Sequence, residues 1–297
     1  MLPSPHIELA AGLVCPRCRG MVTADGEAWL CRTHGAVACR RQDGIIDSLL
    51  EGGMAPHKEF LMEYRRIRRR EGRVTPVGCS FPDVPSDDPF ATEWSLRRRT
   101  MERLMDLLEI RDAIREGTIL DAGAGNGWLT RRLVDAGARV VALDVNDDID
   151  DGLGAGERML EGLSGFERIL GSFDQVPFRD GFFDVVIYNG SFHYAIDRVT
   201  VAVEGMRVVR PGGVLYIVDS PVYADRRSGE EMLRERGKGR SGYLTFQELD
   251  RIAAEIGASM RIERRRRGVV ERIRRRLTEL RLGRRISDMP IVELCAG

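Results

Sequence analysis

The segment that most constrains the fold is 118–146, TILDAGAGNGWLTRRLVDAGARVVALDVN. A short apolar run ends in Asp121 and opens into a turn with glycines at positions 123, 125 and 127. A stretch with helical periodicity follows, and a second apolar run, residues 139–143, ends in Asp144. This order predicts a strand, a glycine-rich turn, a helix and a second strand, which form the first half of a nucleotide-binding α/β fold.

The residues of the turn narrow the choice of ligand. A dinucleotide fingerprint needs its third glycine at position 128, where this chain has Trp128, and a phosphate-binding P-loop needs a Lys-Ser or Lys-Thr pair that the turn lacks. Asp121 would repel a pyrophosphate but suits a ligand with a cationic, amine-bearing end. Asp144 falls where a carboxylate accepts hydrogen bonds from two ribose hydroxyls. S-adenosylmethionine (SAM), which has an ammonium, a sulfonium, a ribose and no phosphate, meets these requirements.

Five segments resemble, in order, the motifs of the class I SAM-dependent methyltransferases. The first motif, D-x-G-x-G-x-G, is matched by Asp121 and the three glycines. The other four are residues 171–178 (GSFDQVPF), 181–189 (GFFDVVIYN), 206–213 (MRVVRPGG) and 243–249 (YLTFQEL). The resemblance covers residues 90–297. It implies an α/β fold with a Rossmann-like, doubly wound, seven-stranded sheet, and SAM as the methyl donor.

The resemblance also implies which residues bind and react. The cofactor-binding positions are Asp121, Gly123, Ala124, Gly125, Gly127, Asp144, Val145, Ser172, Phe173 and Asn189. Ser172 stands where the family often has an aspartate. Transfer of a methyl group from a sulfonium depends mainly on alignment and on exclusion of water. Asn189 and His193 are the candidate catalytic residues, and both a general base and a structural histidine remain open for His193.

The acceptor pocket is expected after the fifth strand. Its candidate residues are Asp219, Ser220, Pro221, Tyr223, Tyr243 and Thr245. Either a small metabolite or RNA remains open as acceptor, although 46 basic and 46 acidic residues give no net attraction to nucleic acid. The alternative function is a non-catalytic, SAM-binding and zinc-dependent interaction protein. Trp128 and the turn 211–213 argue against a nicotinamide-dependent oxidoreductase.

Near the N-terminus, two pairs of metal-ligand residues are separated by twelve residues. They are Cys15 with Cys18 and Cys31 with His34. Two such pairs on tight turns, joined by a short hairpin, predict tetrahedral Cys3His coordination of zinc. Cys39 is the alternative to His34. Four protein ligands leave no open position, so the zinc is expected to be structural.

The N-terminal segment resembles the zinc ribbon that precedes the methyltransferase domain of bacterial ribosomal-RNA guanine methyltransferases. The similarity includes the exit segment 43–49, DGIIDSL. The chain is therefore expected to comprise a zinc-ribbon-like domain over residues 1–49, a linker and helical cap over 50–89, and a methyltransferase domain over 90–297. Helices are predicted over 57–70 and 90–116, and Trp94 and Arg97 of the second helix are candidates for contact with cofactor or substrate.

Arginine runs occur at 65–70, 97–99, 264–267 and 272–276. We expect them to form solvated faces paired with neighbouring glutamates rather than an RNA-binding surface, because aromatic residues are not interleaved with them. The sequence has no apolar run near the roughly 20 residues that span a bilayer, so no membrane partner is expected. It shows no signal peptide, so a cytoplasmic location is expected.

Overall fold

The computed structural model describes residues 9–49, 53–76, 80–115, 117–236, 242–264 and 268–296. Its centre is a sheet with the strand order β7-β6-β5-β8-β9-β13-β12, in which β13 alone runs antiparallel to its neighbours. These strands are β5 (Thr118–Ala122), β6 (Arg139–Asp144), β7 (Phe166–Leu170), β8 (Phe183–Asn189), β9 (Val209–Val218), β12 (Ala258–Glu263) and β13 (Ile291–Ala296). The expected doubly wound α/β fold is confirmed, with the glycine turn at the carboxyl end of β5.

The sheet is longer than the seven strands that we expected, because four N-terminal strands extend it to eleven. They are β1 (Val22–Asp25), β2 (Ala28–Cys31), β3 (Gly35–Arg40) and β4 (Ile46–Asp47). Strand β4 pairs in parallel with β7, and Arg40 donates two hydrogen bonds, of 3.0 and 3.1 Å, to the buried carboxylate of Glu167. The N-terminal strands therefore satisfy the backbone groups of an otherwise open sheet edge.

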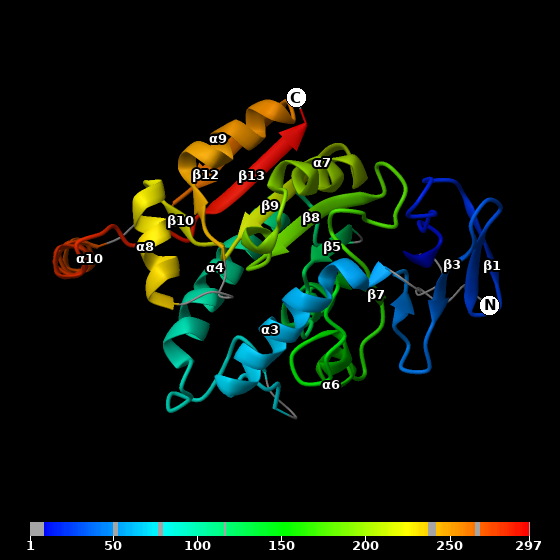
Figure 1. The fold of residues 1–297 in the computed structure, drawn as a ribbon, viewed down its shortest axis with the longest axis horizontal. Coiled ribbons are helices and arrows are strands. Elements are labelled where there is room, and N and C mark those ends of the chain that lie inside the picture. The colour runs from blue at the N-terminus through cyan, green and yellow to red at the C-terminus, as the bar shows by residue number, and fades with distance from the viewer. Residues whose placement is uncertain are drawn as a thin grey trace.

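Helices cover both faces of the sheet (Figure 1). Besides α3, which is described below, the longer helices are α4 (Ala91–Ile110), α5 (Trp128–Asp135), α7 (Arg198–Val208), α8 (Arg226–Arg236), α9 (Phe246–Glu255) and α10 (Val269–Leu282). Ile119 of β5 belongs to the apolar cluster that includes Leu104 and Leu133, and its neighbour Leu120 belongs to the cluster on the other face. Alternate residues of the strand thus enter two separate cores. None of the described helices has the length and apolar character needed to cross a bilayer.

Short elements complete the described chain. They are η1 (Ala55–His57), η2 (Leu153–Ala155), α6 (Gly156–Met159), η3 (Phe192–Tyr194), β10 (Val222–Tyr223) and β11 (Leu244–Thr245). The predicted helix over 90–116 is α4, and it ends at Ile110. Of the arginine runs, residues 265–267 lie outside the described ranges.

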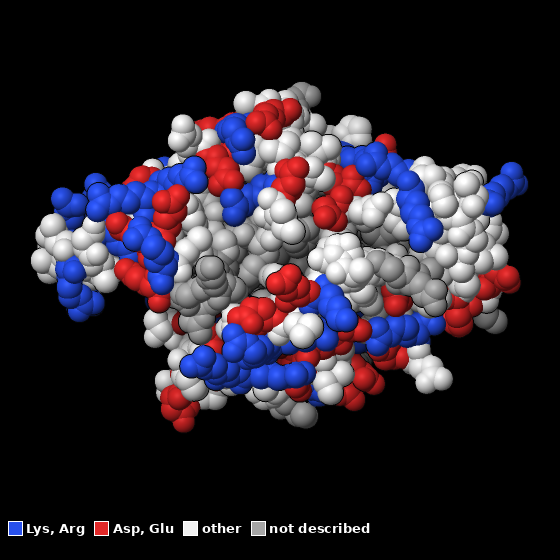
Figure 2. Space-filling view, in the orientation of Figure 1, with Lys and Arg blue, Asp and Glu red and all other residues white. Residues whose placement is uncertain are grey.

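Helix α3 (Lys58–Arg70) lies across the carboxyl ends of the central strands (Figure 1). We expected its arginines to pair with neighbouring glutamates, but most of them pair with aspartates from a distant part of the chain. Arg65 contacts Asp147 at 2.8 Å and Arg69 contacts Asp148 at 2.8 Å, both in the loop that follows β6. Figure 2 shows basic and acidic side chains intermixed over this part of the surface. The ion pairs hold α3 over the strand ends, where a ligand of this fold is expected.

Candidate functional site

The glycine turn leaves space for a ligand beside the backbone. Gly123, Gly125 and Gly127 have φ values of 77°, 55° and 80°, which L-residues with a side chain rarely adopt. A Cβ atom at Gly123 would lie 2.3 Å from the Cβ of Ser191, so this position admits only glycine. A Cβ atom at Gly125 would meet no atom within 4 Å. The turn is therefore tight on its inner side and open on the side that faces the cleft.

Asp144 connects the turn to the end of β6. Its Oδ2 accepts a hydrogen bond from the backbone N–H of Gly125 at 2.8 Å, and its Oδ1 accepts one from the backbone N–H of Asn146 at 2.7 Å. Each carboxylate oxygen keeps a further lone pair for a ligand hydroxyl. Burial raises the pKa of Asp144 to about 6. The arrangement suits recognition of a ribose.

Asp121 lies at the end of β5 and is 1% exposed. Its Oδ2 accepts a hydrogen bond from Thr130 Oγ1 at 2.7 Å, whereas its Oδ1 has no partner among the described residues. Burial raises the pKa of Asp121 to about 7. A buried carboxylate oxygen without a partner is costly, and a bound ammonium group would satisfy it. The residues present thus fit SAM at both of its polar ends.

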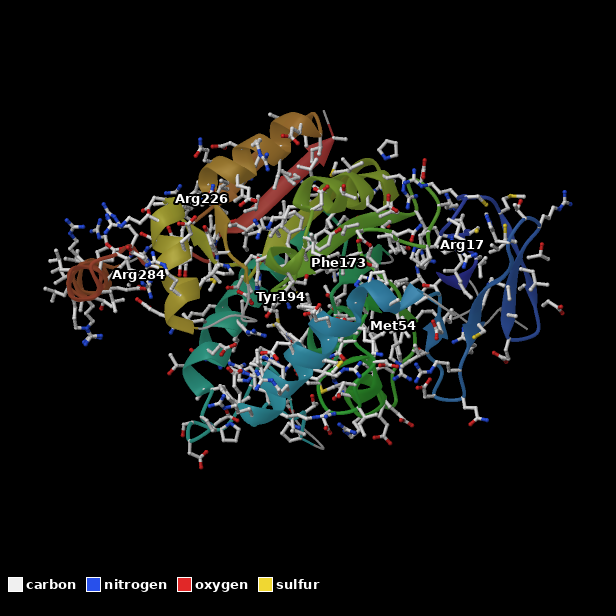
Figure 3. All side chains as sticks on the ribbon, in the orientation of Figure 1. Arg17, Met54, Phe173, Tyr194, Arg226 and Arg284 are labelled. Atoms are coloured by element: carbon white, nitrogen blue, oxygen red, sulfur yellow. The ribbon has the colours of Figure 1, made fainter. Side chains whose placement is uncertain are left out.

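A cavity of about 170 Å³ lies between the glycine turn and α3. Of the predicted cofactor-binding residues, those that line it are Gly123, Gly125, Asp144, Val145, Ser172 and Phe173. Ala124 and Asn189 line an adjoining cavity, which shares Gly123, Gly125 and Tyr64 with the first. Asp121 and Gly127 are among the lining residues of neither cavity, but Asp121 lies two positions before Gly123, which lines both. Figure 3 shows Phe173 and Tyr194, which both line the first cavity, near the centre of the molecule.

Three aromatic residues that we did not assign to the site form its roof. Phe60 and Tyr64 of α3 and Tyr194 of η3 have ring centroids 5.6 to 5.8 Å apart, and all three line the 170 Å³ cavity. The sequence predicts a helix over 57–70 but does not indicate which part of the fold this helix covers.

A second cavity, of about 320 Å³, shares Tyr64, Gly190 and Tyr194 with the first. Its remaining polar and aromatic lining residues are Arg68, Glu71, Arg73, Glu93, Arg97, His193, Asp219, Tyr223 and Ser287. We call this space the acceptor chamber. Of the other residues considered for the acceptor pocket, Pro221 lines it, whereas Ser220, Tyr243 and Thr245 are not among its lining residues. Thr245 instead accepts a hydrogen bond from the backbone N–H of Glu248 at the start of α9.

His193 is 6% exposed and lies on the wall of the acceptor chamber. Its Nδ1 is 3.1 Å from the hydroxyl oxygen of Ser220, in hydrogen-bonding contact. Burial, aided by the positive charges of Arg198 and Arg97, lowers the pKa of His193 to about 3. The imidazole is therefore neutral at physiological pH and a weak base. Trp94, the other residue that we considered from α4, is buried and stacks on Phe81 with ring centroids 4.1 Å apart.

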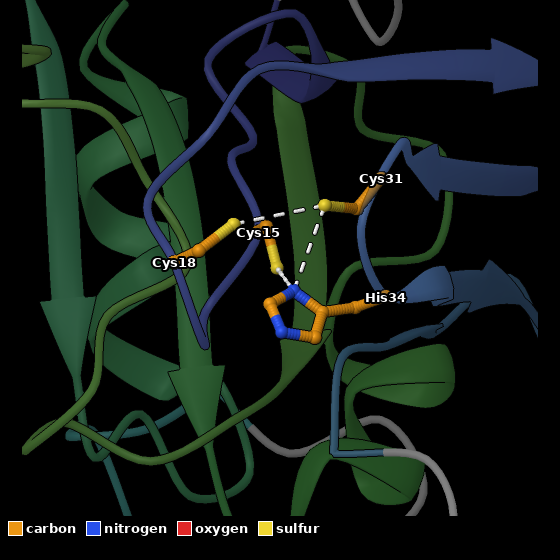
Figure 4. A group of neighbouring side chains, drawn as sticks. All are labelled: Cys15, Cys18, Cys31 and His34. Atoms are coloured by element: carbon orange, nitrogen blue, oxygen red, sulfur yellow. Dashed lines mark hydrogen bonds between the residues drawn. The ribbon is translucent and has the colours of Figure 1, made fainter.

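The four predicted metal ligands meet at one point beside the β1–β2 hairpin (Figure 4). Cys15 Sγ lies 3.4 Å and Cys31 Sγ 3.7 Å from His34 Nδ1, and the sulfur atoms of Cys18 and Cys31 are 3.7 Å apart. Ligands bound tetrahedrally at the usual Zn–S and Zn–N lengths lie about 3.5 to 3.8 Å from one another. The donor set and its spacing therefore fit zinc. Cys39 lies in β3 opposite Asp47 and is not in the group.

The Cys3His cluster is attached to the loop that lines the cofactor cavity. The side-chain amide of Gln175 donates to the carbonyl of Pro16, between Cys15 and Cys18, at 2.6 Å. The backbone N–H of Val14 donates to the carbonyl of Pro177 at 3.0 Å. The turn that carries two of the cluster's cysteines thus positions the loop that contains Ser172 and Phe173.

Comparison with known proteins agrees with this geometry. Residues 120–217 match the family described as "Methyltransferase domain". A sarcosine/dimethylglycine N-methyltransferase of Halorhodospira halochloris is 33% identical over 133 residues, which are 43% of this chain and 45% of that protein. An uncharacterized methyltransferase of Mycobacterium tuberculosis is 36% identical over 168 residues, 56% of this chain and 58% of that protein. The chain thus matches about half the length of these relatives.

The fold is shared with solved methyltransferase structures. Geranyl diphosphate C-methyltransferase from Streptomyces coelicolor, solved with Mg²⁺, geranyl diphosphate and S-adenosyl-L-homocysteine, has a TM-score of 0.57 at 15% identity. The match covers 82% of this chain and 99% of that one. The chain therefore has the α/β, Rossmann-like fold of these methyltransferase structures, and its residues 120–217 match the methyltransferase domain family.

Proposed function

We propose that the protein is a SAM-dependent methyltransferase. The observation that carries this proposal is the pair of carboxylates at adjacent strand ends. Asp144 is fixed by two backbone N–H groups with lone pairs left for a ribose, and Asp121 is buried with an oxygen that lacks a partner among the described residues. Relatives that carry methyltransferase names and the matching domain support the same activity.

When bound, SAM would supply a methyl group on a positively charged sulfur. The chain's own residues would bind it, orient it and exclude water. Asp121 would hold the ammonium end and Asp144 the ribose, with Phe173 and Ser172 beside the adenine. Tyr64 and Tyr194 separate the 170 Å³ cavity from the acceptor chamber because both line each of them. The methyl group would pass between the two spaces at this boundary.

The acceptor that fits the chamber best is a small molecule. The chamber lies between α3, α4 and the strand ends, and Arg68 anchors α3 by hydrogen bonds to Asp151. A nucleotide within RNA would need room for the adjoining backbone, and side chains of α3 and α4 border the chamber, which favours a free small molecule. His193 would position the acceptor through Nε2, since Nδ1 is engaged by Ser220 and the lowered pKa makes general-base catalysis inefficient.

We also propose that Cys15, Cys18, Cys31 and His34 bind one structural zinc ion. All four ligand atoms lie within 4.8 Å of one another, and four protein ligands leave no position for a substrate. The zinc would stabilise the hairpin β1–β2 and, through Pro16 and Gln175, the loop beside the adenine.

The activity can be tested with methyl-labelled SAM and a fractionated extract of the source cells. We expect label to appear in a small-molecule fraction, and the Asp144→Ala variant to transfer none. Label in RNA would contradict the small-molecule acceptor but not the methyltransferase activity. Label in no fraction, from a protein that binds SAM, would support the alternative of a non-catalytic SAM-binding protein.

The raised pKa of Asp121 predicts a pH dependence of SAM binding. Only the ionised carboxylate attracts the ammonium group, so affinity should fall as the pH decreases from 8 through the pKa of about 7. Calorimetric titrations at pH 8 and pH 6 measure the difference. An affinity that is equal at the two values, or higher at pH 6, would contradict the role given to Asp121.

The same carboxylate should lower the stability of the ligand-free protein at high pH. Its pKa is higher in the folded chain, about 7, than in an unfolded chain, about 4, so its contribution to stability decreases as pH rises between these values. We expect Asp121→Asn to raise the thermal midpoint at pH 8 more than at pH 5.5, and to weaken SAM binding. A variant less stable than wild type at pH 8 would contradict this.

A further inference from the structure

Helix α10, between β12 and β13, presents an apolar face to solvent. Ile273, Leu277 and Leu280 are 55%, 61% and 65% exposed, and Val269 and Val270 are exposed as well. At 3.6 residues per turn these five side chains occupy an arc of about 100°. The helix projects from the body at the end opposite β1 (Figure 1), and its side chains radiate around its axis (Figure 3).

Arginines border this apolar face on both sides. Arg272 and Arg276 follow one edge and Arg274 and Arg281 the other, and all four are exposed. Figure 2 shows the same end of the molecule with basic atoms around uncoloured ones. The acidic residues of the helix, Glu271 and Glu279, lie on its inner face, where Arg275 contacts Glu279 at 3.3 Å.

We propose that α10 docks on an anionic lipid surface. An apolar stripe between rows of arginines matches the boundary between acyl chains and negatively charged headgroups. A second copy of this chain fits less well, since packing two such faces together would bring the arginine rows into proximity. An anionic bilayer would cover the apolar stripe with acyl chains and would also pair the bordering arginines with negatively charged headgroups.

The inner face of α10 connects this surface to the acceptor chamber. Arg274, Arg275 and Thr278 line a third cavity of about 400 Å³ between α10 and α4. This cavity shares Leu96, Asp219, Ser287 and Met289 with the acceptor chamber. A docked α10 would therefore lie between this cavity and the bilayer, with one face toward each.

The test is sedimentation of the full chain with lipid vesicles, in the absence of SAM. We expect binding to vesicles that contain phosphatidylglycerol, weakened by added salt, and at least tenfold weaker binding to phosphatidylcholine alone. The double variant Ile273→Glu, Leu277→Glu should lose binding at least tenfold. Arg272→Gln with Arg281→Gln should lose a similar factor, since each basic residue contributes about fivefold.

Val203→Glu is the matched control, because Val203 is an exposed apolar residue on a different helix, α7. It should bind as wild type does, and thermal unfolding should show that all variants are folded. Equal binding to both vesicle types, no binding to phosphatidylglycerol, or unchanged binding of the double variants would overturn the proposal. So would a wild-type dimer that the Ile273 and Leu277 substitutions dissociate and that does not bind vesicles. Since no step uses SAM, the result is independent of the methyltransferase activity.

Discussion

Replacement of Asp144 by alanine is expected to weaken SAM binding about 100-fold. The carboxylate would make two hydrogen bonds to ribose hydroxyls, and each bond to a charged group contributes about 1.5 kcal/mol. The substitution also removes Oδ2, which accepts a hydrogen bond from the backbone N–H of Gly125 at 2.8 Å and so holds the glycine turn in place. Isothermal titration calorimetry of wild type and variant measures the change directly.

The matched control for Asp144 is Asp106→Ala, which removes an exposed carboxylate from α4 away from the cofactor cavity. It should leave the affinity unchanged. Thermal unfolding of the Asp144 variant distinguishes loss of the site from loss of the fold. A folded Asp144→Ala protein with wild-type affinity would remove this residue from the site and contradict the assignment of the ribose position.

Replacement of Cys15 by serine is expected to abolish zinc binding and to expose residues 9–49 to protease. Zinc coordination supplies much of the folding free energy of small metal-bound modules. Because Cys15 is buried and the same turn holds Gln175, SAM affinity should also fall severalfold. Metal analysis should give one zinc per wild-type chain and none per variant chain. Limited proteolysis measures whether the N-terminal segment has become accessible to protease.

Cys39→Ser is the matched control for the zinc prediction, since Cys39 lies in the same module but outside the Cys3His cluster. It should retain one zinc ion and protease resistance. Loss of zinc from this variant, together with retention in His34→Ala, would show that Cys39 is the fourth ligand. A wild-type protein that is free of metal and equally resistant would contradict the site as a whole.

Local motifs made much of the site predictable. The glycine turn depends on positive φ values that glycine adopts readily, and the metal ligands come in two pairs whose members are each three positions apart, so both could be recognised from short spacings. The two carboxylates are predictable for the same reason, because each follows a buried strand whose length is set by its apolar run.

Contacts between distant segments were not predictable. The roof formed by Phe60, Tyr64 and Tyr194 joins residues about 130 positions apart, and the arginines of α3 pair with aspartates about 80 positions away. A charge run gives no information on which opposite charges it will meet. The pairing of β4 with β7, which adds four strands to the sheet, depends likewise on a tertiary contact.

Thr245 shows a signal that we misread. We assigned it to the acceptor pocket, but its side chain accepts from the N–H of Glu248, three residues on, and so caps α9. A threonine followed three positions later by glutamate before an apolar helix is the pattern of such a cap. Its local role was therefore readable from the sequence, and Tyr243 is also not among the residues lining the acceptor chamber.

The most direct test of the account is a calorimetric titration of the purified protein with SAM at pH 8. The paired carboxylates of β5 and β6 predict one binding site per chain, with heat released or absorbed on saturation and an accompanying rise in the thermal midpoint. A protein that is folded, yet shows neither heat nor a shift of the midpoint, would contradict the assignment of this cleft to SAM.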